Sequence, residues 1–254
     1  MSWAARGRFI ILLIVGAVVT AFLTVVFITT FYKTPSCTDG KQNQDEAGID
    51  CGGSCAYLCI AQQVPPTVLF TKTLQNISGR VDIIAEVENK NANAAAKNVP
   101  YAIALYDANQ VLVKEISGTL DLPPGAVVPV YVSGVTTGEQ SVTHAFLTLE
   151  PSSIKWYTMN ANTRTTPAVS TITQSGSRDA PRIEVVFINS GLTAYDTVEI
   201  IAFVRGESGD IIAASKTLVR TIPAQGQATA IFTWNTAFSS ATTSVEVVPI
   251  IPLL

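Results

Sequence analysis

The segment Val81-Asp-Ile-Ile-Ala-Glu-Val-Glu-Asn89 has the clear residue alternation of a β-strand. Its apolar residues at positions 81, 83, 85 and 87 alternate with acidic residues at 82, 86 and 88. A period of two places the apolar side chains on one face of a β-strand and the acidic ones on the other. We therefore predict a strand with one buried face and one largely solvated face, ended by the turn signal Asn89-Lys-Asn-Ala-Asn93.

Similar segments return in the second half of the chain, most of them 98 to 101 positions later. Fixed spacing of this kind indicates two copies of one structural unit. The paired segments are Pro66-Thr-Val68 with Pro167-Ala-Val169, Val81–Asn89 with Arg182–Asn189, Asn98–Tyr106 with Thr197–Val204, and Leu122–Gly125 with Ile222–Gly226.

The composition of both copies is typical of an all-β structure. Short runs rich in Val, Ile, Thr and Ala are broken by Gly, Pro and Asn, as in a sandwich of antiparallel strands. We predict an all-β ectodomain with two tandem immunoglobulin-like β-sandwiches, residues 63–151 and 167–254, joined by a Ser/Thr/Asn-rich linker at 152–166. Neither copy has the Cys…Trp…Cys core of an antibody domain.

Four segments of the first copy form a recognisable set: Val87-Glu-Asn89, Asn98-Val99, Leu105-Tyr106-Asp107 and Leu122-Pro-Pro-Gly125. This set resembles the bacterial FxLYD domain and the related late-embryogenesis-abundant type 2 sandwich. The resemblance covers most of residues 66–249, and the second copy departs from it with Val204-Arg205 where Tyr-Asp would stand. It implies a fold and a role as an accessory module, without implying an activity.

An apolar segment precedes the β region. Residues 9–32 contain no Asp, Glu, Lys, Arg, Pro or Asn, and as a helix they would extend about 36 Å, enough to cross a bilayer. The run is longer than the apolar part of a signal peptide and lacks a small-residue cleavage site at its end, so we favour a retained transmembrane signal-anchor over a cleaved signal.

The charges around this segment predict its orientation. Arg6 and Arg8 lie in the short N-terminus, residues 1–8, and positive flanks stay in the cytoplasm. We therefore expect a single-pass protein of the cell membrane with its C-terminal domains outside the cytoplasm. Without Arg6, Arg8 and Lys33, 13 basic and 19 acidic residues remain, a net charge of −6 that argues against a nucleic-acid partner.

All four cysteines, Cys37, Cys51, Cys55 and Cys59, fall in a juxtamembrane segment at 33–62. An even number of cysteines outside a membrane predicts two disulfides, because that compartment oxidises thiols and so short a segment cannot build a core of its own. The three possible pairings stay open. A four-cysteine zinc site normally brings its ligands as two close pairs, which this spacing does not provide.

The same segment is rich in hard oxygen ligands: Asp39, Asn43, Asp45, Glu46 and Asp50. Their short spacing is what calcium requires, so a calcium site is one interpretation. The segment resembles a Cys-Asp-Gly…Asn…Glu…Asp-Cys-Gly-Gly motif of bacterial surface proteins, although Thr38 separates Cys37 from Asp39. In the alternative interpretation these side chains solvate a disulfide knot and form Asx turns, and no cofactor is bound.

Residues for catalysis are scarce. The only histidine is His144, and there is no Gly-x-Ser-x-Gly elbow or phosphate loop. Six aromatic residues are interpreted as packing residues, with a carbohydrate-binding or protein-binding surface as the alternative: Trp156, Trp234, Tyr101, Tyr106, Tyr131 and Tyr195. We expect a non-enzymatic binding or structural module of the cell envelope, with an envelope protein or polysaccharide as partner. The alternatives are an accessory subunit of a membrane assembly and an extracytoplasmic hydrolase.

Overall fold

The computed structural model describes residues 3–31, 36–43, 45–77, 80–138, 140–159 and 165–253. The chain divides into two compact units, Met1–Ala56 and Tyr57–Leu254, and each is described by itself. The predicted end of the apolar segment at Tyr32, the flanking Lys33 and the linker residues 160–164 lie outside the described residues.

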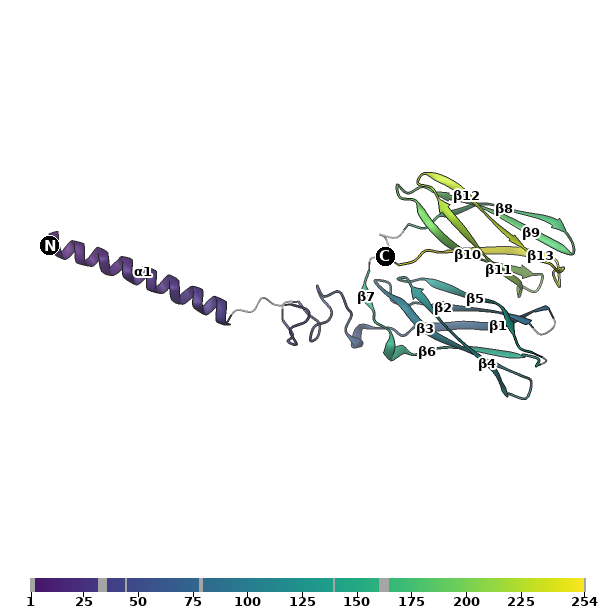
Figure 1. The fold of residues 1–254 in the computed structure, drawn as a ribbon, viewed down its shortest axis with the longest axis horizontal. Helices are drawn as coiled ribbons and strands as arrows, with labels where there is room; N and C mark the ends of the chain where they lie inside the picture. Colours follow the sequence, from purple (N-terminus) through teal and green to yellow (C-terminus); the bar gives the residue numbers. More distant parts are fainter. Residues whose placement is uncertain are drawn as a thin grey trace. The chain divides into compact units, whose positions relative to one another are not determined.

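The first unit begins with one long helix, α1 (Trp3–Phe31) (Figure 1). Within it, Gly7–Thr29 has a mean hydropathy of 3.0 and is long and apolar enough to cross a membrane. The hydroxyls of Thr20 and Thr24 donate at 2.8 Å to the carbonyls of Gly16 and Thr20, one turn earlier. These hydroxyls are therefore satisfied inside the helix, as an apolar environment demands.

The second unit opens with a β-sandwich made of two antiparallel sheets, ordered β1-β2-β5 and β4-β3-β6. Their inward side chains form one core, in which Ile83, Val87, Ile103 and Leu105 are fully buried. The strands are β1 (Thr67–Ile77), β2 (Arg80–Glu88), β3 (Ala94–Tyr106), β4 (Leu112–Leu122), β5 (Val127–Thr136) and β6 (His144–Leu149).

A second sandwich follows, with sheets ordered β12-β9-β8 and β11-β10-β13. Its separate core includes Ile183, Val185, Phe187 and Phe232. The strands are β8 (Ala168–Ser177), β9 (Ala180–Asn189), β10 (Tyr195–Gly206), β11 (Ile211–Ile222), β12 (Gly226–Thr233) and β13 (Thr242–Ile250). The predicted fold class, an all-β body after one apolar helix and a small disulfide-bonded segment, is confirmed.

The turns after β2 and β9 are built around a buried asparagine with the same hydrogen bonds. Asn89 donates to the carbonyls of Ala94, Leu122 and Pro123, and its own oxygen accepts the amide N–H of Asn91. Asn189 donates to Thr193, Ile222 and Pro223 and accepts the amide of Gly191. Each asparagine thus satisfies carbonyls at or just before the start of the next strand and at the end of the strand after it, which fixes the corner.

The two sandwiches pack on each other through a third apolar cluster. Ile84 and Tyr131 on the first meet Ile201, Phe203, Ile211 and Ala214 on the second. Figure 1 shows the β1-β2-β5 sheet lying against the β11-β10-β13 sheet. The prediction of a solvated outer face on β2 is therefore wrong: Ile84 is 0% exposed and Asp82 only 7%, because the second sandwich covers them.

The segment between the sandwiches packs on the first of them. Two short elements, η2 (Pro151–Ser153) and β7 (Tyr157–Thr158), flank Ile154 and Trp156, which are both buried in the first core. β7 pairs with the start of β3. Another short helix, η1 (Ile60–Gln62), precedes β1. The packing interpretation of Trp156 is confirmed at 2% exposure, while the domain boundaries stay a prediction.

Candidate functional sites

All four cysteines are oxidised, as predicted. Cys37 and Cys55 form a disulfide with an S–S distance of 1.99 Å, and Cys51 pairs with Cys59, which leaves no free thiol. The sequence left the pairing open, and the structure identifies it: Cys37–Cys55 closes the longer loop and Cys51–Cys59 the shorter one. Disulfides persist where thiols are oxidised, which is the environment outside the cytoplasm.

The acidic side chains of this segment organise its turns. Asp50 accepts the backbone N–H groups of Asp39 and Gly40 at 3.0–3.1 Å, and Asp39 accepts the N–H of Lys41 and the side-chain amide of Asn43. Asp39 thus forms an Asx turn with Lys41, as predicted for the acidic residues, whereas Asp50 joins two parts of the segment that are distant in sequence.

Asp45 and Glu46 continue this pattern. Ser54 donates its hydroxyl to Asp45 at 2.7 Å, and this hydrogen bond lowers the pKa of Asp45. A Cβ at Gly53 would overlap the Asp45 carbonyl, so the close turn requires glycine there. Glu46 is buried and accepts the backbone N–H of Asn43 at 3.1 Å.

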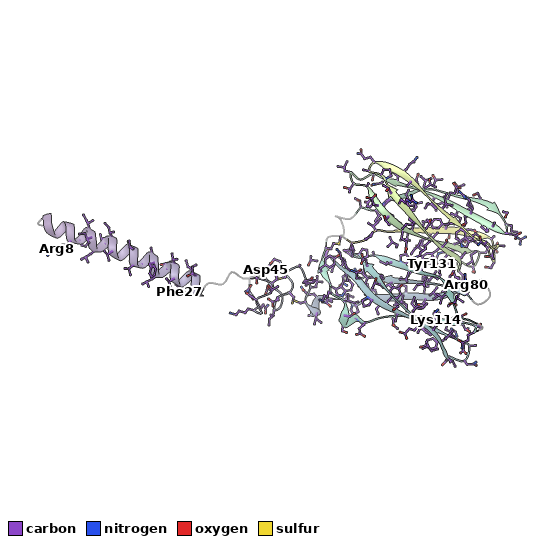
Figure 2. All side chains as sticks on the ribbon, viewed as in Figure 1. Arg8, Phe27, Asp45, Arg80, Lys114 and Tyr131 are labelled. Carbon is purple, nitrogen blue, oxygen red and sulfur yellow. A yellow bond between two sulfur atoms is a disulfide. The ribbon has the colours of Figure 1, made fainter. Side chains whose placement is uncertain are left out.

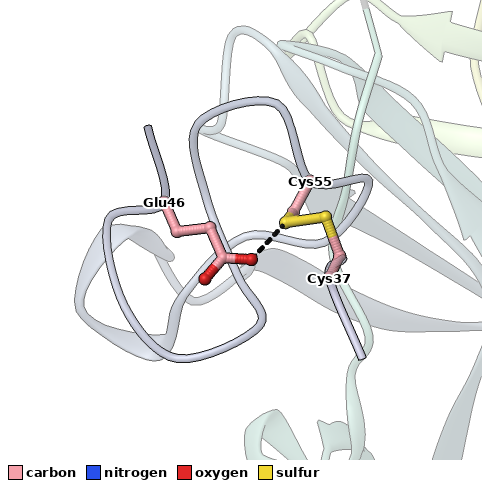
Figure 3. A group of neighbouring side chains, drawn as sticks. All are labelled: Cys37, Glu46 and Cys55. Carbon is pink, nitrogen blue, oxygen red and sulfur yellow. Dashed lines mark hydrogen bonds between the residues drawn. A yellow bond between two sulfur atoms is a disulfide. The ribbon is translucent and has the colours of Figure 1, made fainter. Parts of the chain in front are cut away.

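Glu46 also lies beside the first disulfide (Figure 3). Its Oε1 is 3.2 Å from Cys55 Sγ, and ligand atoms of Cys37, Glu46 and Cys55 all lie within 4.8 Å of one another. Both sulfurs are bonded to each other and carry neither a proton to donate nor a thiolate charge. The trio therefore lacks the sulfur chemistry of a zinc site, which needs deprotonated thiols.

The five predicted calcium ligands share one short segment, and most of their oxygens already accept hydrogen bonds. The side-chain amide oxygen of Asn43, Oδ1, differs: it is buried and accepts no hydrogen bond among the described residues. An amide oxygen beside carboxylates is the kind of ligand that calcium takes. The hydrogen bonds of this segment do not test calcium binding, which stays a prediction.

A second candidate site lies at the joint between the sandwiches. Figure 2 labels Tyr131, which projects from β5 toward the second sandwich. Its hydroxyl lies 3.0 Å from Asp82 Oδ2 and 3.2 Å from the carbonyl oxygen of Ala214, across the joint, so its one proton is shared between two acceptors. The other carboxylate oxygen of Asp82 accepts the backbone N–H of Gly134. Burial, followed by the charge of Asp82, raises the pKa of the Tyr131 hydroxyl, so the hydroxyl keeps its proton and remains a donor.

Two further groups at the joint have perturbed acidity. Burial raises the pKa of Glu86, and the nearby charge of Glu246 adds to this while Arg205 opposes it. Burial also raises the pKa of Tyr101, with a smaller contribution from Glu199. Arg205 and Glu246 themselves form an ion pair at 3.1 Å. Both shifts have the same direction because the second sandwich packs against this side of the first and removes solvent from these groups.

Beside this joint there is a cleft of about 660 Å³. Strands β1, β2 and β5 of the first sandwich form one wall, and the β10–β11 turn, β11 and the β12–β13 loop of the second form the other. Trp234 and Phe238 on the β12–β13 loop are in edge contact, with ring centroids 5.1 Å apart. Trp234 also donates its indole N–H to Ala214 at 3.2 Å.

His144 is exposed at the start of β6, away from the residues that line this cleft. The sequence identified Tyr131 and Trp234 as packing residues, with a binding surface as the alternative, but it gave no indication that Asp82, Lys72 and Asp210 line a cleft. The available signal was Asp82 itself, an acid between apolar neighbours on a strand whose partner sheet the sequence does not reveal.

A comparison with protein-family models finds no match, and neither does a comparison with curated proteins. Solved structures similar to parts of this chain include red sea bream transglutaminase, at 12% identity and a TM-score of 0.25 over 75% of this chain and 32% of that one. Another is a beta-glucuronidase from glycoside hydrolase family 2, at 9% identity and a TM-score of 0.25 over 87% of this chain and 29% of that one. The chain thus spans about a third of these proteins, and TM-scores this low carry no argument about its function.

Proposed function

We propose that this protein is a non-enzymatic, membrane-anchored module that lies outside the cytoplasm and binds an envelope protein or polysaccharide. The observation that carries the proposal is the position of two disulfides shortly after an apolar helix of membrane-spanning length. A helix of this kind places the C-terminal remainder of the chain on one side of a membrane, and stable disulfides belong on the oxidising side.

The orientation is supported by Arg6 and Arg8 before the helix and the acidic segment after it. A fusion of alkaline phosphatase to the C-terminus tests it, because that enzyme is active only after export. We expect an active fusion, and an inactive one when the phosphatase is attached after residue 8. Intact mass spectrometry of the membrane form should find residues 1–34 retained, whereas a shortened chain would identify a cleaved signal.

The joint between the sandwiches supports binding over catalysis. Its most buried carboxylate, Asp82, is held by Tyr131 and Gly134 within the first sandwich, and the Tyr131 hydroxyl also contacts the Ala214 carbonyl of the second. This contact across the joint fixes its two walls relative to each other, which is how a recognition surface is pre-organised. A hydrolase would instead need a nucleophile or a pair of acids directed at a common substrate position.

Cross-linking in native membranes tests the binding role. The full chain, carrying a photo-reactive group in the second unit, should give a discrete cross-linked species. The same full chain with the group placed instead at the exposed Thr38, in the first unit, serves as the control. Equal products from the two proteins would contradict the proposal, because a partner of the membrane-proximal segment would then account for them.

The family resemblance and the repeat belong to the same proposal: two immunoglobulin-like modules of one origin, similar to the FxLYD domain. The matched bonds of Asn89 and Asn189 support it. The strand registers support it too. Ala85 pairs with Val130 in the first sandwich, and the residues at the same distance further along the chain, Val185 and Ala230, pair with each other in the second.

Calcium binding by the disulfide segment is a separate part of the proposal, and the buried Asn43 oxygen supports it. Calorimetric titration of the full chain with calcium chloride tests it. We expect one ion per chain, uptake lost in Asn43→Ala, and uptake unchanged in the exposed control Thr38→Ala. No heat above dilution in the parent protein would leave only the turn-forming role of the acidic residues.

A further inference from the structure

We infer that the cleft between the two sandwiches is a binding site for a neutral oligosaccharide. The inference rests on the proposed binding function and assigns it a site and a ligand class. The cleft has a volume of about 660 Å³. Ligand sites commonly occupy clefts of roughly 300–1,000 Å³ and favour domain interfaces, so both its size and its place fit a small ligand.

The β12–β13 loop brings exposed hydrogen-bonding side chains to the wall that the second sandwich forms. The side chains of Asn235, Thr236 and Ser239 line the cleft and are exposed. Within the described part of the chain they form no hydrogen bond with other residues. Their donors and acceptors are thus available to the hydroxyl groups of a sugar, which both donate and accept.

Aromatic side chains stand next to these polar groups. Trp234 and Phe238 line the cleft from the same loop and are half-buried, so part of each ring is accessible. Their edge contact and the Trp234–Ala214 hydrogen bond hold the rings in place. A rigid aromatic surface beside hydroxyl and amide groups suits a sugar ring, which has apolar C–H faces and a polar rim.

The charges of the cleft exclude an anionic ligand. Lys72 of the first sandwich lies 3.8 Å from Asp210 of the second, and Asp210 also accepts the Ser208 hydroxyl. The remaining charged residue of the lining is the buried Asp82. With one cation already beside an acid, the cleft offers no excess positive charge to a phosphate or sulfate, so a neutral ligand is favoured.

The walls are held by the joint itself. Tyr131 and Asp82 both line the cleft, and Tyr131, held by Asp82, joins the two sandwiches through its contact with the Ala214 carbonyl. Because both walls are fixed before a ligand arrives, binding need not order them, which lowers its entropic cost.

Saturation-transfer NMR with the full chain in lipid nanodiscs tests this inference, since maltoside detergents would compete as sugars. The probes are cellotriose, chitotriose, mannotriose and maltotriose. We expect at least one to bind with a Kd of about 1 mM or tighter. We also expect that ligand to change tryptophan fluorescence through Trp234.

Two variants locate the site. The double change Asn235→Ala/Ser239→Ala removes exposed polar groups from the cleft and should weaken binding by about tenfold or more. Asn109→Ala, on the exposed β3–β4 turn, is the matched control and should bind like the parent. A thermal transition equal to that of the parent shows that the double variant is folded.

Each other outcome overturns the inference in a distinguishable way. Binding that both variants retain places the sugar elsewhere, and the proposed binding function stands. No binding of any trisaccharide, together with a cross-linked protein partner, rejects the sugar and keeps the function. No sugar binding and no cross-linked partner rejects both.

Discussion

The β1-β2-β5 and β8-β9-β12 sheets each bury an apolar inner face in their own sandwich, but their outer faces differ in exposure to solvent. Ile83, Ala85 and Val87 point into the first core as Ile183, Val185 and Phe187 point into the second. Outside, Ile84 and Asp82 on β2 are covered by the second sandwich, whereas Ile188 on β9 is 43% exposed. Alternation in the sequence therefore determines which side chains point into the core of a sandwich, whereas a neighbouring sheet determines whether the outward side chains are buried or exposed.

The polar groups of the two outer faces differ accordingly. On the covered face, Asp82 is buried and held by Tyr131 and Gly134. On the other, Arg182 and Glu184 form an ion pair at 2.7 Å with both side chains about 40% exposed. A solvated ion pair of this kind contributes little to stability, whereas a buried carboxylate depends on every donor it has.

The largest expected effect comes from the apolar centre of the covered face. Ile84→Ala should lower the free energy of unfolding by about 3 kcal/mol, because it opens a cavity at the joint. Ile188→Ala on the exposed face is the matched control and should cost less than about 1 kcal/mol. Guanidinium unfolding of the full chain measures both, and equal losses would break the comparison.

The next largest effect is expected at the buried asparagine that each sandwich has after its β2 or β9 strand. Asn89→Ala and Asn189→Ala should each cost about 2 kcal/mol, because each leaves buried carbonyls without a donor. Asn109→Ala, exposed on a turn, should change stability by less than about 0.5 kcal/mol. Chemical denaturation followed by circular dichroism provides the values. A large loss at one corner and none at the other would show that the matched bonds do not carry matched energies.

The sequence predicted the inner faces well because their signal is local. Alternation in Val81–Asn89 is sufficient to identify a half-buried strand, and an asparagine after it is sufficient to identify a turn. The helix and the oxidised cysteines were also predictable, from apolar length and from cysteine number. None of these inferences requires knowing which sheet lies next to which.

The joint and its cleft could not be predicted for the same reason. Asp82 and Glu86 have the residue type of a solvated face, and their burial depends on a sheet that lies more than a hundred residues later in the chain. Lys72, Asp210 and Asn235 likewise converge only after two sandwiches dock. The disulfide pairing is a similar case, since sequence allows three solutions.

A smaller effect is expected from the hydroxyl that joins the two outer surfaces. Tyr131→Phe keeps the ring but removes the donor to Asp82 and Ala214, and should cost about 1.5 kcal/mol. Tyr106→Phe is the control, because Tyr106 makes a ring contact with Phe146 and should lose less than about 0.5 kcal/mol.

The same variant tests whether the joint couples the sandwiches. Trp156 lies in the first core and Trp234 packs against the second. In two Trp→Phe variants, one that retains only Trp156 and one that retains only Trp234, tryptophan fluorescence reports the unfolding of each sandwich separately. The two unfolding curves should coincide in the parent and separate in Tyr131→Phe. Coincident curves in both proteins would mean that the apolar cluster alone provides the coupling.

The smallest effect is a pH dependence at the covered face. Burial, then the charge of Glu246, raises the pKa of Glu86 above its ordinary value of 4.5. The folded protein thus holds this proton more tightly than the unfolded chain does. The stability from this group is present below pH 4.5 and is lost as pH rises through the raised pKa of the folded state.

Glu86→Gln removes this dependence. Relative to the parent, the variant should gain stability as pH rises through that window and keep the gain at neutral pH. The gain should stay below about 1 kcal/mol, because Glu86 is only partly buried and solvent screens its charge. Glu115→Gln, exposed on β4, removes the same charge away from the joint and should leave the pH profile parallel to that of the parent. Urea unfolding from pH 4 to pH 8 measures the profiles. A flat difference between Glu86→Gln and the parent would mean that the second sandwich does not desolvate this face, and the contrast between the two sheets would then rest on Ile84 and Asp82 alone.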